Sequence, residues 1–197
     1  MFDHSPVFHV KHLDSVGFDK IGALCALIRR WNGTVRLVSR NDCAVLESRH
    51  VANCLALVPI IEHLRPRSIL DLGSGGGFPG LVVAIATGYP VHLVEADQRK
   101  AEFLREATRS LGLTAAVHAM RADMVDMQVE IVTARAVAPL PQLWRMARPL
   151  LTPGGTGLFL KGRSVEVEMR ATLAETLASG LVWSFPDGTI VELNTPR

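Results

Sequence analysis

Short apolar segments alternate with helical stretches from residue 68 onward, and this alternation constrains the fold more than any other feature of the sequence. The apolar segments 68–72 and 91–95 have the length of buried strands, and helical stretches follow them from Pro79 and over 97–111. Such alternation is typical of parallel strands joined by right-handed crossovers. The sequence therefore predicts an α/β fold with helices on both faces of one sheet.

The same pattern continues toward the C-terminus. Further strands are expected near residues 115–119, 130–133, 156–161, 181–185 and 189–193. Further helices are expected near residues 139–150 and 164–179.

The residues before this alternation show helical spacing instead. A first amphipathic helix is expected from Phe18, and its apolar residues recur every three or four positions at Ile21, Leu24, Cys25, Ile28 and Trp31. A second helix is expected over 42–64, with Asp42 as its cap and Pro59 as a kink or division.

The boundary between the two patterns lies at Arg65, because the residue before Pro66 avoids the helical conformation. We expect an N-terminal helical appendage over residues 1–65 and a second domain over residues 66–197. The chain has 197 residues, of which 48% are hydrophobic and 20% charged, and can bury a sizeable core.

Composition also limits the expected cellular compartment and the expected ligands. No segment approaches the roughly 18 uninterrupted apolar residues of a membrane span, and the first residues lack a secretory pattern, so we expect a cytoplasmic protein without a membrane partner. Cys25, Cys43 and Cys54 lack C-x-x-C spacing, which predicts reduced thiols and no metal. A net charge of +2 allows a nucleic-acid partner without requiring one.

A glycine-rich loop over residues 71–80 separates the first predicted strand from the next helix. Glycines let the backbone turn tightly and approach a ligand, and Pro79 is tolerated at a helix start. Glu95 ends the next strand, where an acidic side chain accepts hydrogen bonds from ribose hydroxyls. Together they predict a nucleotide-like ligand. The alternatives are a loop that only joins strand and helix, and a helix-dipole role for Glu95, for which Asp97 is better placed.

Asp71, two positions before Gly73, helps to distinguish between two possible ligands. A nicotinamide dinucleotide needs G-x-G-x-x-G for its pyrophosphate, and the alternating glycines Gly73, Gly75 and Gly77 do not discriminate cleanly. S-adenosylmethionine carries no phosphate and a positive sulfonium, which acidic neighbours suit. The sequence favours a methyltransferase that uses this cofactor, with a nicotinamide-dependent enzyme as the alternative.

Candidate residues also follow the third and fourth predicted strands. Ala122 and Asp123 lie where this architecture reads adenine with a backbone N–H and an acidic side chain, although Asp123 can also cap a turn. Arg135 lies at the mouth where the transferred methyl is expected, and its planar fork suits a base or a phosphate, although a solvated rim is the alternative.

The residues near this mouth limit which methylation reactions we expect. The segment 133–139 lacks the Asn/Asp-Pro-Pro-aromatic turn used on adenine amino groups, and every cysteine precedes the glycine loop, which disfavours methylation of pyrimidine carbon. A ring nitrogen with a free lone pair, such as guanine N7, needs only alignment.

The chain resembles a known family along nearly its whole length. Its marks are Trp31-Asn32, Leu37-Val38-Ser39, Arg49-His50, the loop 71–80 with its Phe-Pro-Gly ending, Arg99-Lys100, Phe103-Leu104, Arg135-Ala136, Pro139-Leu140 and Leu160-Lys161-Gly162. Together they resemble the bacterial small-subunit ribosomal RNA guanine-N7 methyltransferases, also called glucose-inhibited division protein B.

The resemblance implies a Rossmann-like class I methyltransferase sheet and methyl transfer from S-adenosylmethionine to N7 of a guanine in the 530 loop of 16S ribosomal RNA. The partner would be this RNA or a small-subunit precursor, met by a monomer. Arg135 would contact the cofactor or the target guanine as the catalytic residue, and Lys161 and Arg49 would hold RNA. The cofactor site implied by the matching positions comprises Asp71, Gly73, Gly75, Gly77, Phe78, Glu95, Ala122, Asp123 and Arg135.

Two departures from the family pattern fall in the appendage. Asn53-Cys54 stands where the family has Asp-Ser, and Arg36-Leu37-Val38-Ser39 where it has Asn-Leu-Thr-Ser. The appendage arginines can face RNA or form a solvated surface, and they are Arg29, Arg30, Arg36, Arg40 and Arg49. His50 is expected to be a hydrogen-bonded packing residue, with a catalytic role as the alternative. The open alternatives are a methyltransferase of this fold acting on a small molecule or another RNA, and a non-catalytic RNA-binding module.

Overall fold

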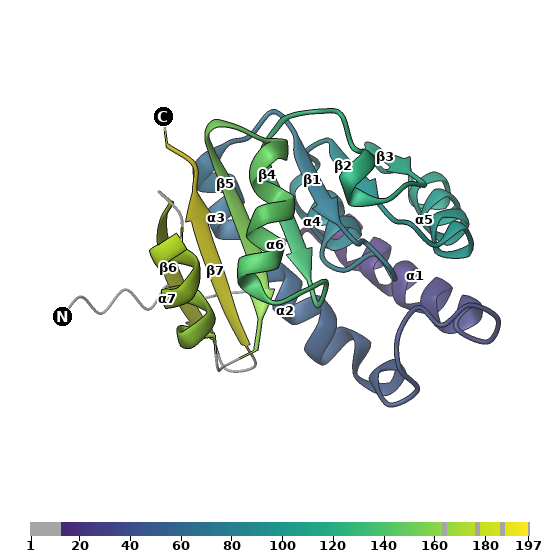
Figure 1. Ribbon diagram of the computed structural model, residues 1–197. Coiled ribbons are helices and arrows are strands. Elements are labelled where there is room, and N and C mark those ends of the chain that lie inside the picture. The colour runs from purple at the N-terminus through teal and green to yellow at the C-terminus, as the bar shows by residue number, and fades with distance from the viewer. Residues whose placement is uncertain (1–12, 163–164, 176–177, 186–187, 197) are drawn as a thin grey trace.

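The computed structural model describes residues 13–162, 165–175, 178–185 and 188–196. Its centre is a seven-stranded sheet in the order β3-β2-β1-β4-β5-β7-β6 (Figure 1). The strands are β1 (Ile69–Leu72), β2 (Val91–Val94), β3 (Ala115–His118), β4 (Val129–Arg135), β5 (Leu151–Lys161), β6 (Ser179–Phe185) and β7 (Gly188–Asn194). Strands β1 to β5 pair in parallel, and β7 is antiparallel to both β5 and β6.

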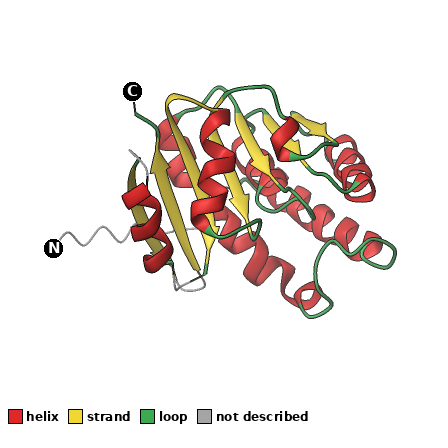
Figure 2. Cartoon of the chain, in the orientation of Figure 1, coloured by secondary structure: helices red, strands yellow, loops and turns green. Residues whose placement is uncertain are grey.

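Helices cover both faces of this sheet (Figure 2). One face carries α6 (Leu140–Ala147) and α7 (Glu166–Glu175). The short turn η3 (Ala122–Met124) lies between β3 and β4, and η4 (Arg148–Leu150) lies between α6 and β5. The elements that cover the other face are α1 (Ser15–Trp31), η1 (Asp42–Val45), η2 (Leu46–Val51), α2 (Ala52–Leu55), α3 (Val58–Leu64), α4 (Gly80–Thr87) and α5 (Gln98–Ser110). This arrangement confirms the predicted α/β fold.

The parallel strands are buried on both faces, as their near-continuous apolar sequences require. In β1, Ile69 faces the core beneath α4, whereas Leu70 and Leu72 face the core beneath α6. The strand order reverses between β1 and β4, so the crossovers from these two neighbours leave in opposite directions. Their carboxyl ends therefore open a crevice, which is where ligands bind in sheets of this kind.

Strands β4 to β7 are longer than predicted, and β5 and β4 differ most from the prediction. The strand expected at 156–161 begins at Leu151, and its pairing with β4 shifts register between Val129 and Ile131. Pro153, Gly154 and Gly155 lie in this irregularity within the strand. Strand β4 extends to Arg135, which is its last residue and pairs with Leu160.

The helix predicted over 42–64 is not one regular α-helix. It consists of a 3-10 turn, a π-helical turn and two short α-helices. The second α-helix starts at Val58 and has Pro59 in its first turn, which confirms the predicted division at Pro59. The prediction that Asp42 caps this run is wrong. The Ser39 hydroxyl accepts a hydrogen bond from the Asp42 N–H (3.2 Å) and donates one to its carboxylate (2.6 Å).

The last predicted helix, 164–179, is shorter in the structure. Helix α7 spans Glu166–Glu175, while positions 164, 176 and 177 of the prediction lie outside the described residues. Strand β6 already begins at Ser179. Residues 1–12 of the predicted appendage and Arg197 of the second domain likewise lie outside the described part of the chain.

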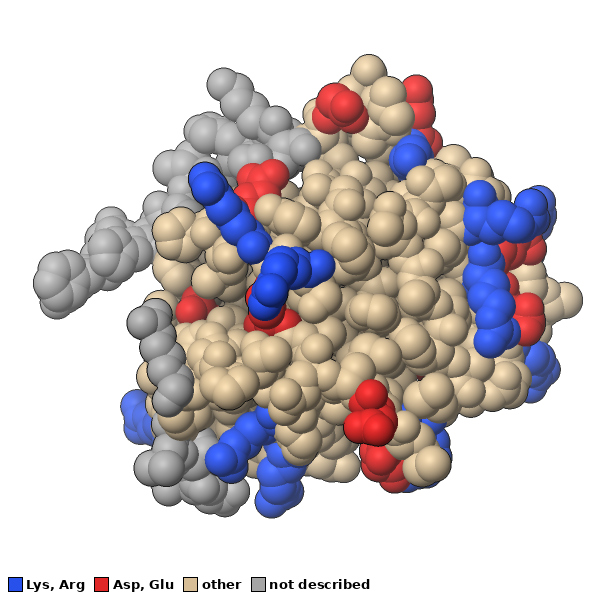
Figure 3. Space-filling view, turned by 90° about the horizontal axis from the view of Figure 1, so that it is seen from above, with Lys and Arg blue, Asp and Glu red and all other residues tan. Residues whose placement is uncertain are grey.

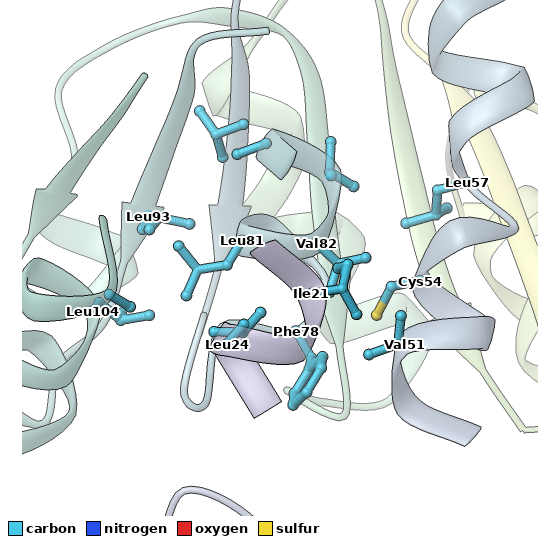
Figure 4. Packing of buried hydrophobic residues seen from close by; sticks show 14 of the residues in the cluster. Ile21, Leu24, Val51, Cys54, Leu57, Phe78, Leu81, Val82, Leu93 and Leu104 are labelled. Atoms are coloured by element: carbon cyan, nitrogen blue, oxygen red, sulfur yellow. The ribbon is translucent and has the colours of Figure 1, made fainter. Parts of the chain in front are cut away.

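The appendage helices share a hydrophobic core with the sheet. Ile21 and Leu24 of α1 point toward Leu81 and Val82 of α4, with Cys54 of α2 beside them (Figure 4). The helical run 42–64 is long and apolar enough to cross a membrane by length and composition alone. Its side chains are nevertheless buried in this core at Leu46, Val51, Cys54, Leu57 and Ile61.

We expect Leu24→Ala to lower the free energy of unfolding by about 2–5 kcal/mol, because Leu24 is fully buried and its removal leaves a cavity. Phe18→Ala on the same helix is the control, since Phe18 is 53% exposed and should change it by about 0.5 kcal/mol or less. Urea unfolding followed by circular dichroism measures both. Equal effects of the two substitutions would contradict a core shared with α1.

Candidate functional site

The glycine loop leaves the carboxyl end of β1 and crosses the crevice to α4. Gly73, Gly75 and Gly77 have φ angles of 65°, 53° and 88°, in the left-handed region that favours glycine. A Cβ added at Gly73 would lie 2.8 Å from Cγ2 of Val137. The backbone of the loop therefore lies so close to Val137 that a residue larger than glycine does not fit at position 73 unless Val137 moves.

Asp71 ties three elements together beneath this loop. Its side chain is fully buried, and one oxygen accepts a hydrogen bond from the Thr133 hydroxyl of β4 (2.8 Å) while the other accepts one from the Gly80 N–H at the start of α4 (3.1 Å). Burial raises the pKa of Asp71 to about 6, although these bonds and the charge of Arg135 lower it in part. The carboxylate is therefore directed toward the protein and fixes the shape of the loop.

Glu95 closes the loop from the end of β2. Its carboxylate accepts hydrogen bonds from the N–H groups of Gly75 and Asp97, both at 2.8 Å. A carboxylate offers about four acceptor positions, so further donors such as hydroxyl groups can bind it. Asp97 caps α5 as predicted, accepting hydrogen bonds from the N–H groups of Arg99 and Lys100, and these bonds lower its pKa.

A cleft of about 700 Å³, here called the first cleft, lies on one side of the crevice. Gly73 and Glu95 line it together with Ala122 and Asp123 from the segment after β3. Asp123 is exposed and forms a two-pronged ion pair with Arg121 at 3.0 Å for each of its two closest contacts. The structure thus brings four of the predicted cofactor residues to one cavity.

A second cleft, of about 440 Å³, lies on the other side of the segment after β4. It is lined by Arg49, His50, Asn53, Arg135 and Lys161, so it collects the predicted RNA-binding and catalytic positions. Ala136 lines this cleft, and the next residue, Val137, lines the first. The two cavities are therefore separated by this short segment.

Arg135 is held on two sides in the second cleft. Its Nη1 lies 2.6 Å from Nδ1 of His50, and its Cζ lies 4.8 Å from the centre of the Phe78 ring, a cation–π distance. Phe78 is 3% exposed and its ring centre lies 5.5 Å from that of His50. Phe78 thus packs against the guanidinium of Arg135. Because Phe78 belongs to the glycine loop, its ring links this loop to the second cleft.

Lys161 and Arg49 differ in their surroundings. The Lys161 ammonium donates to the carbonyl of Ala138 (3.1 Å) and pairs with Glu168 (2.9 Å), which also accepts a hydrogen bond from the Leu140 N–H. Lys161 thereby fixes the loop after β4. The Arg49 side chain is 61% exposed, although one of its nitrogens lies 3.6 Å from Asp42.

Sequence reasoning missed two partners of the site residues. Thr133 hydrogen-bonds Asp71 from 62 residues away, and His50 contacts Arg135 across 85 residues. His50 is predicted to be a hydrogen-bonded packing residue, but its position after Arg49 in the appendage gives no sign that its partner lies on β4. Contacts over such separations follow from tertiary packing.

The strand order, with one antiparallel strand inserted next to the last parallel one, and the crevice beside the glycine loop define a class I methyltransferase fold. Solved methyltransferases share it. The O-methyltransferase from Bacillus cereus in complex with SAH superposes with a TM-score of 0.61 at 17% identity, covering 94% of this chain and 93% of that chain.

Sequence comparison narrows this class to one family. The pattern of the rRNA small subunit methyltransferase G family matches residues 18–188. The ribosomal RNA small subunit methyltransferase G of Granulibacter bethesdensis is 47% identical over 158 residues, which cover 80% of this chain and 74% of that protein. The same enzyme of Gluconobacter oxydans is 44% identical, covering 80% and 81%. The chain belongs to the rRNA small subunit methyltransferase G family.

Gly73→Ala is expected to weaken binding of S-adenosylmethionine at least about 10-fold, because its Cβ would push Val137 and distort the wall of the first cleft. Gly88→Ala is a matched control. Gly88 has a similar φ of 69° but open space around its Cβ position, so that variant carries comparable backbone strain outside the cleft. Titration calorimetry measures both, and equal affinities would contradict the assignment of Gly73.

The raised pKa of Asp71 predicts a pH-dependent stability. The folded chain keeps the Asp71 proton up to a pH of about 6, whereas the unfolded chain loses it near 3.8, so this stabilising contribution is lost as the pH rises between these values. The free energy of unfolding of the wild type, minus that of Asp71→Asn, should therefore fall from about pH 4 to about pH 6 and stay level above about pH 7. Urea titrations of both proteins test this, and a difference that rises over that range would contradict it.

Proposed function

We propose that this protein transfers a methyl group from S-adenosylmethionine to N7 of a guanine in the 530 loop of 16S ribosomal RNA. One observation carries the proposal: a cofactor-sized cleft and a basic cleft adjoin at the carboxyl ends of β1 and β4, divided only by the segment from Arg135 to Val137. Membership of the rRNA small subunit methyltransferase G family supports the RNA substrate.

The residues of the first cleft fit the cofactor. Glu95 has acceptor positions for ribose hydroxyls, Gly73 leaves room for a ligand against the backbone, and Ala122 and Asp123 lie where adenine is expected. When bound, S-adenosylmethionine supplies an electrophilic methyl group on a positively charged sulfur. Asp71 would act through the loop it holds, because both of its oxygens already accept hydrogen bonds from the protein.

Methyl transfer to N7 requires little from the protein beyond alignment of the base with the methyl group. The N7 lone pair forms the new N–C bond while the C–S bond breaks and its electron pair stays on sulfur, so no proton has to move. The positive charge passes to the guanine. Arg135 would therefore position the base or its phosphate, since a cation does not stabilise a developing positive charge.

The RNA would approach the side of the molecule that carries the second cleft. Arg36 and Arg40 are exposed and flank Leu37 and Val38, which line this cleft, and Arg49 is exposed at its edge. Arg29 and Arg30 instead pair with Glu47 and Glu106. We assign this RNA-facing edge to the appendage (residues 1–65) and the first cleft to residues 66–197, and expect a cytoplasmic monomer.

At the opposite end of the molecule, several of the described basic side chains are paired with acidic ones. Figure 3 looks onto the amino ends of the parallel strands, where Lys and Arg side chains lie in several small groups and many of them have acidic neighbours. Arg67 at the entry to β1, for example, pairs with Glu130 at 2.8 Å. This distribution favours the carboxyl ends of the strands as the RNA-binding side.

The test is methyl transfer from labelled cofactor to purified small ribosomal subunits that lack the modification, with the modified nucleotide located by mass spectrometry. We expect the wild type to label one guanine at N7. Arg135→Ala should lower the rate by about 100-fold while the midpoint of thermal unfolding changes little. Labelling of another RNA or of small molecules alone, or cofactor binding without transfer, would replace the proposal with one of the alternatives. Equal losses of rate and stability would make Arg135 structural.

A further inference from the structure

We propose that His50 is a positioning residue, which holds the guanidinium of Arg135 in place for methyl transfer and is itself oriented by Asp42. The inference rests on the proposed function and adds to it a role for a side chain of the appendage. It is carried by the contacts of His50 with two charged residues from different parts of the chain.

The contact with Arg135 fixes which nitrogen of His50 bears the proton. A guanidinium remains protonated at any physiological pH and can only donate. Because its Nη1 lies 2.6 Å from Nδ1 of His50, that nitrogen must accept, and the imidazole is neutral with its proton on Nε2. The His50 side chain is only 13% exposed, so water does not readily replace this contact.

The protonated nitrogen faces a carboxylate. Nε2 of His50 lies 3.1 Å from Oδ1 of Asp42, close enough for an electrostatic attraction that orients the ring. Asp42 is held in turn by the Ser39 hydroxyl, and this bond, together with His50, lowers the pKa of Asp42. The carboxylate is therefore charged and favours the tautomer that can accept from Arg135.

The backbone around His50 is unusual as well. His50 lies in the π-helical turn η2, whose ends are anchored by the buried side chains of Leu46 and Val51. Turns of this type are rare and occur frequently at functional sites. Here the turn presents His50 to the end of β4, while Arg49, its neighbour, remains exposed.

Restraint of Arg135 matters because the reaction depends on alignment. A free arginine side chain has several rotatable bonds and loses conformational entropy when it is fixed. His50 at one end of the guanidinium and the Phe78 ring beneath it restrict these rotations before RNA binds. A displacement of about 1 Å can lower a rate by about 100-fold.

Protonation of His50 would break this arrangement. Burial and then the charge of Arg135 lower the pKa of His50, while Asp42 raises it in part and Arg49 lowers it slightly. Lys161 from β5 lines the same cleft. Below the pKa of His50 both ring nitrogens donate, so Nδ1 can no longer accept from Arg135 and a second positive charge lies beside it. The rate of transfer should therefore fall as the medium becomes acidic.

The test compares His50→Ala and His50→Gln with the wild type and with His63→Ala, which replaces an exposed histidine of α3. Single-turnover rates are measured with saturating small subunits and cofactor over a range of pH. We expect His50→Ala to lose about 10- to 100-fold in rate with little change in cofactor affinity or thermal unfolding midpoint. His50→Gln should recover much of the rate, because its side-chain oxygen can accept from Arg135, and should lack the acidic fall. Asp42→Asn should give an intermediate loss.

Three results would overturn the inference. His50→Ala could retain the wild-type rate, or His50→Gln could be as slow as His50→Ala, which would remove the need for an acceptor. The unfolding midpoint of His50→Ala could also fall in step with the rate, which would make the role structural. All three are read against an active wild type and an unchanged His63→Ala, so they leave the proposed function standing, whereas an inactive wild type would overturn both.

Discussion

The buried carboxylate of Asp71 joins the three segments on which the site depends. It binds a hydroxyl of β4 and the first N–H of α4 from the end of β1, and it thereby fixes the start of the glycine loop between them. A charge in this position is costly, as the raised pKa of about 6 shows. Two well-placed donors offset part of that cost, and the result is a loop with little freedom to move.

The rest of the site follows from this anchor. With the loop fixed, the Gly75 N–H meets Glu95 from β2, and Phe78 lies beneath the guanidinium at the end of β4. The first cleft and the second cleft then lie on either side of one short segment. A donor group and an acceptor base bound in these two cavities would be neighbours, which is what direct transfer requires.

The appendage is part of this construction. Its first helix packs on α4 in the core of one face of the sheet, and His50 reaches the end of β4. A segment predicted as an appendage therefore contributes a wall of the second cleft. The departures from the family pattern at Asn53 and Cys54 fall in this wall and in the core behind it, since Asn53 lines the cleft and Cys54 is fully buried.

The sequence by itself determined the fold class, the position of the glycine loop, the Asp97 cap and the division at Pro59, because each depends on local spacing and backbone preference. It also indicated Gly73, Glu95, Ala122 and Asp123 as neighbours, since the carboxyl ends of parallel strands meet at one edge. Only the tertiary structure decided the rest. The contacts of Asp71 and Arg135 and the register shift between β4 and β5 join separate segments of the chain, and side-chain packing that no local pattern encodes sets their geometry. The π-helical turn is local in sequence, but the buried side chains of Leu46 and Val51 anchor it in the core.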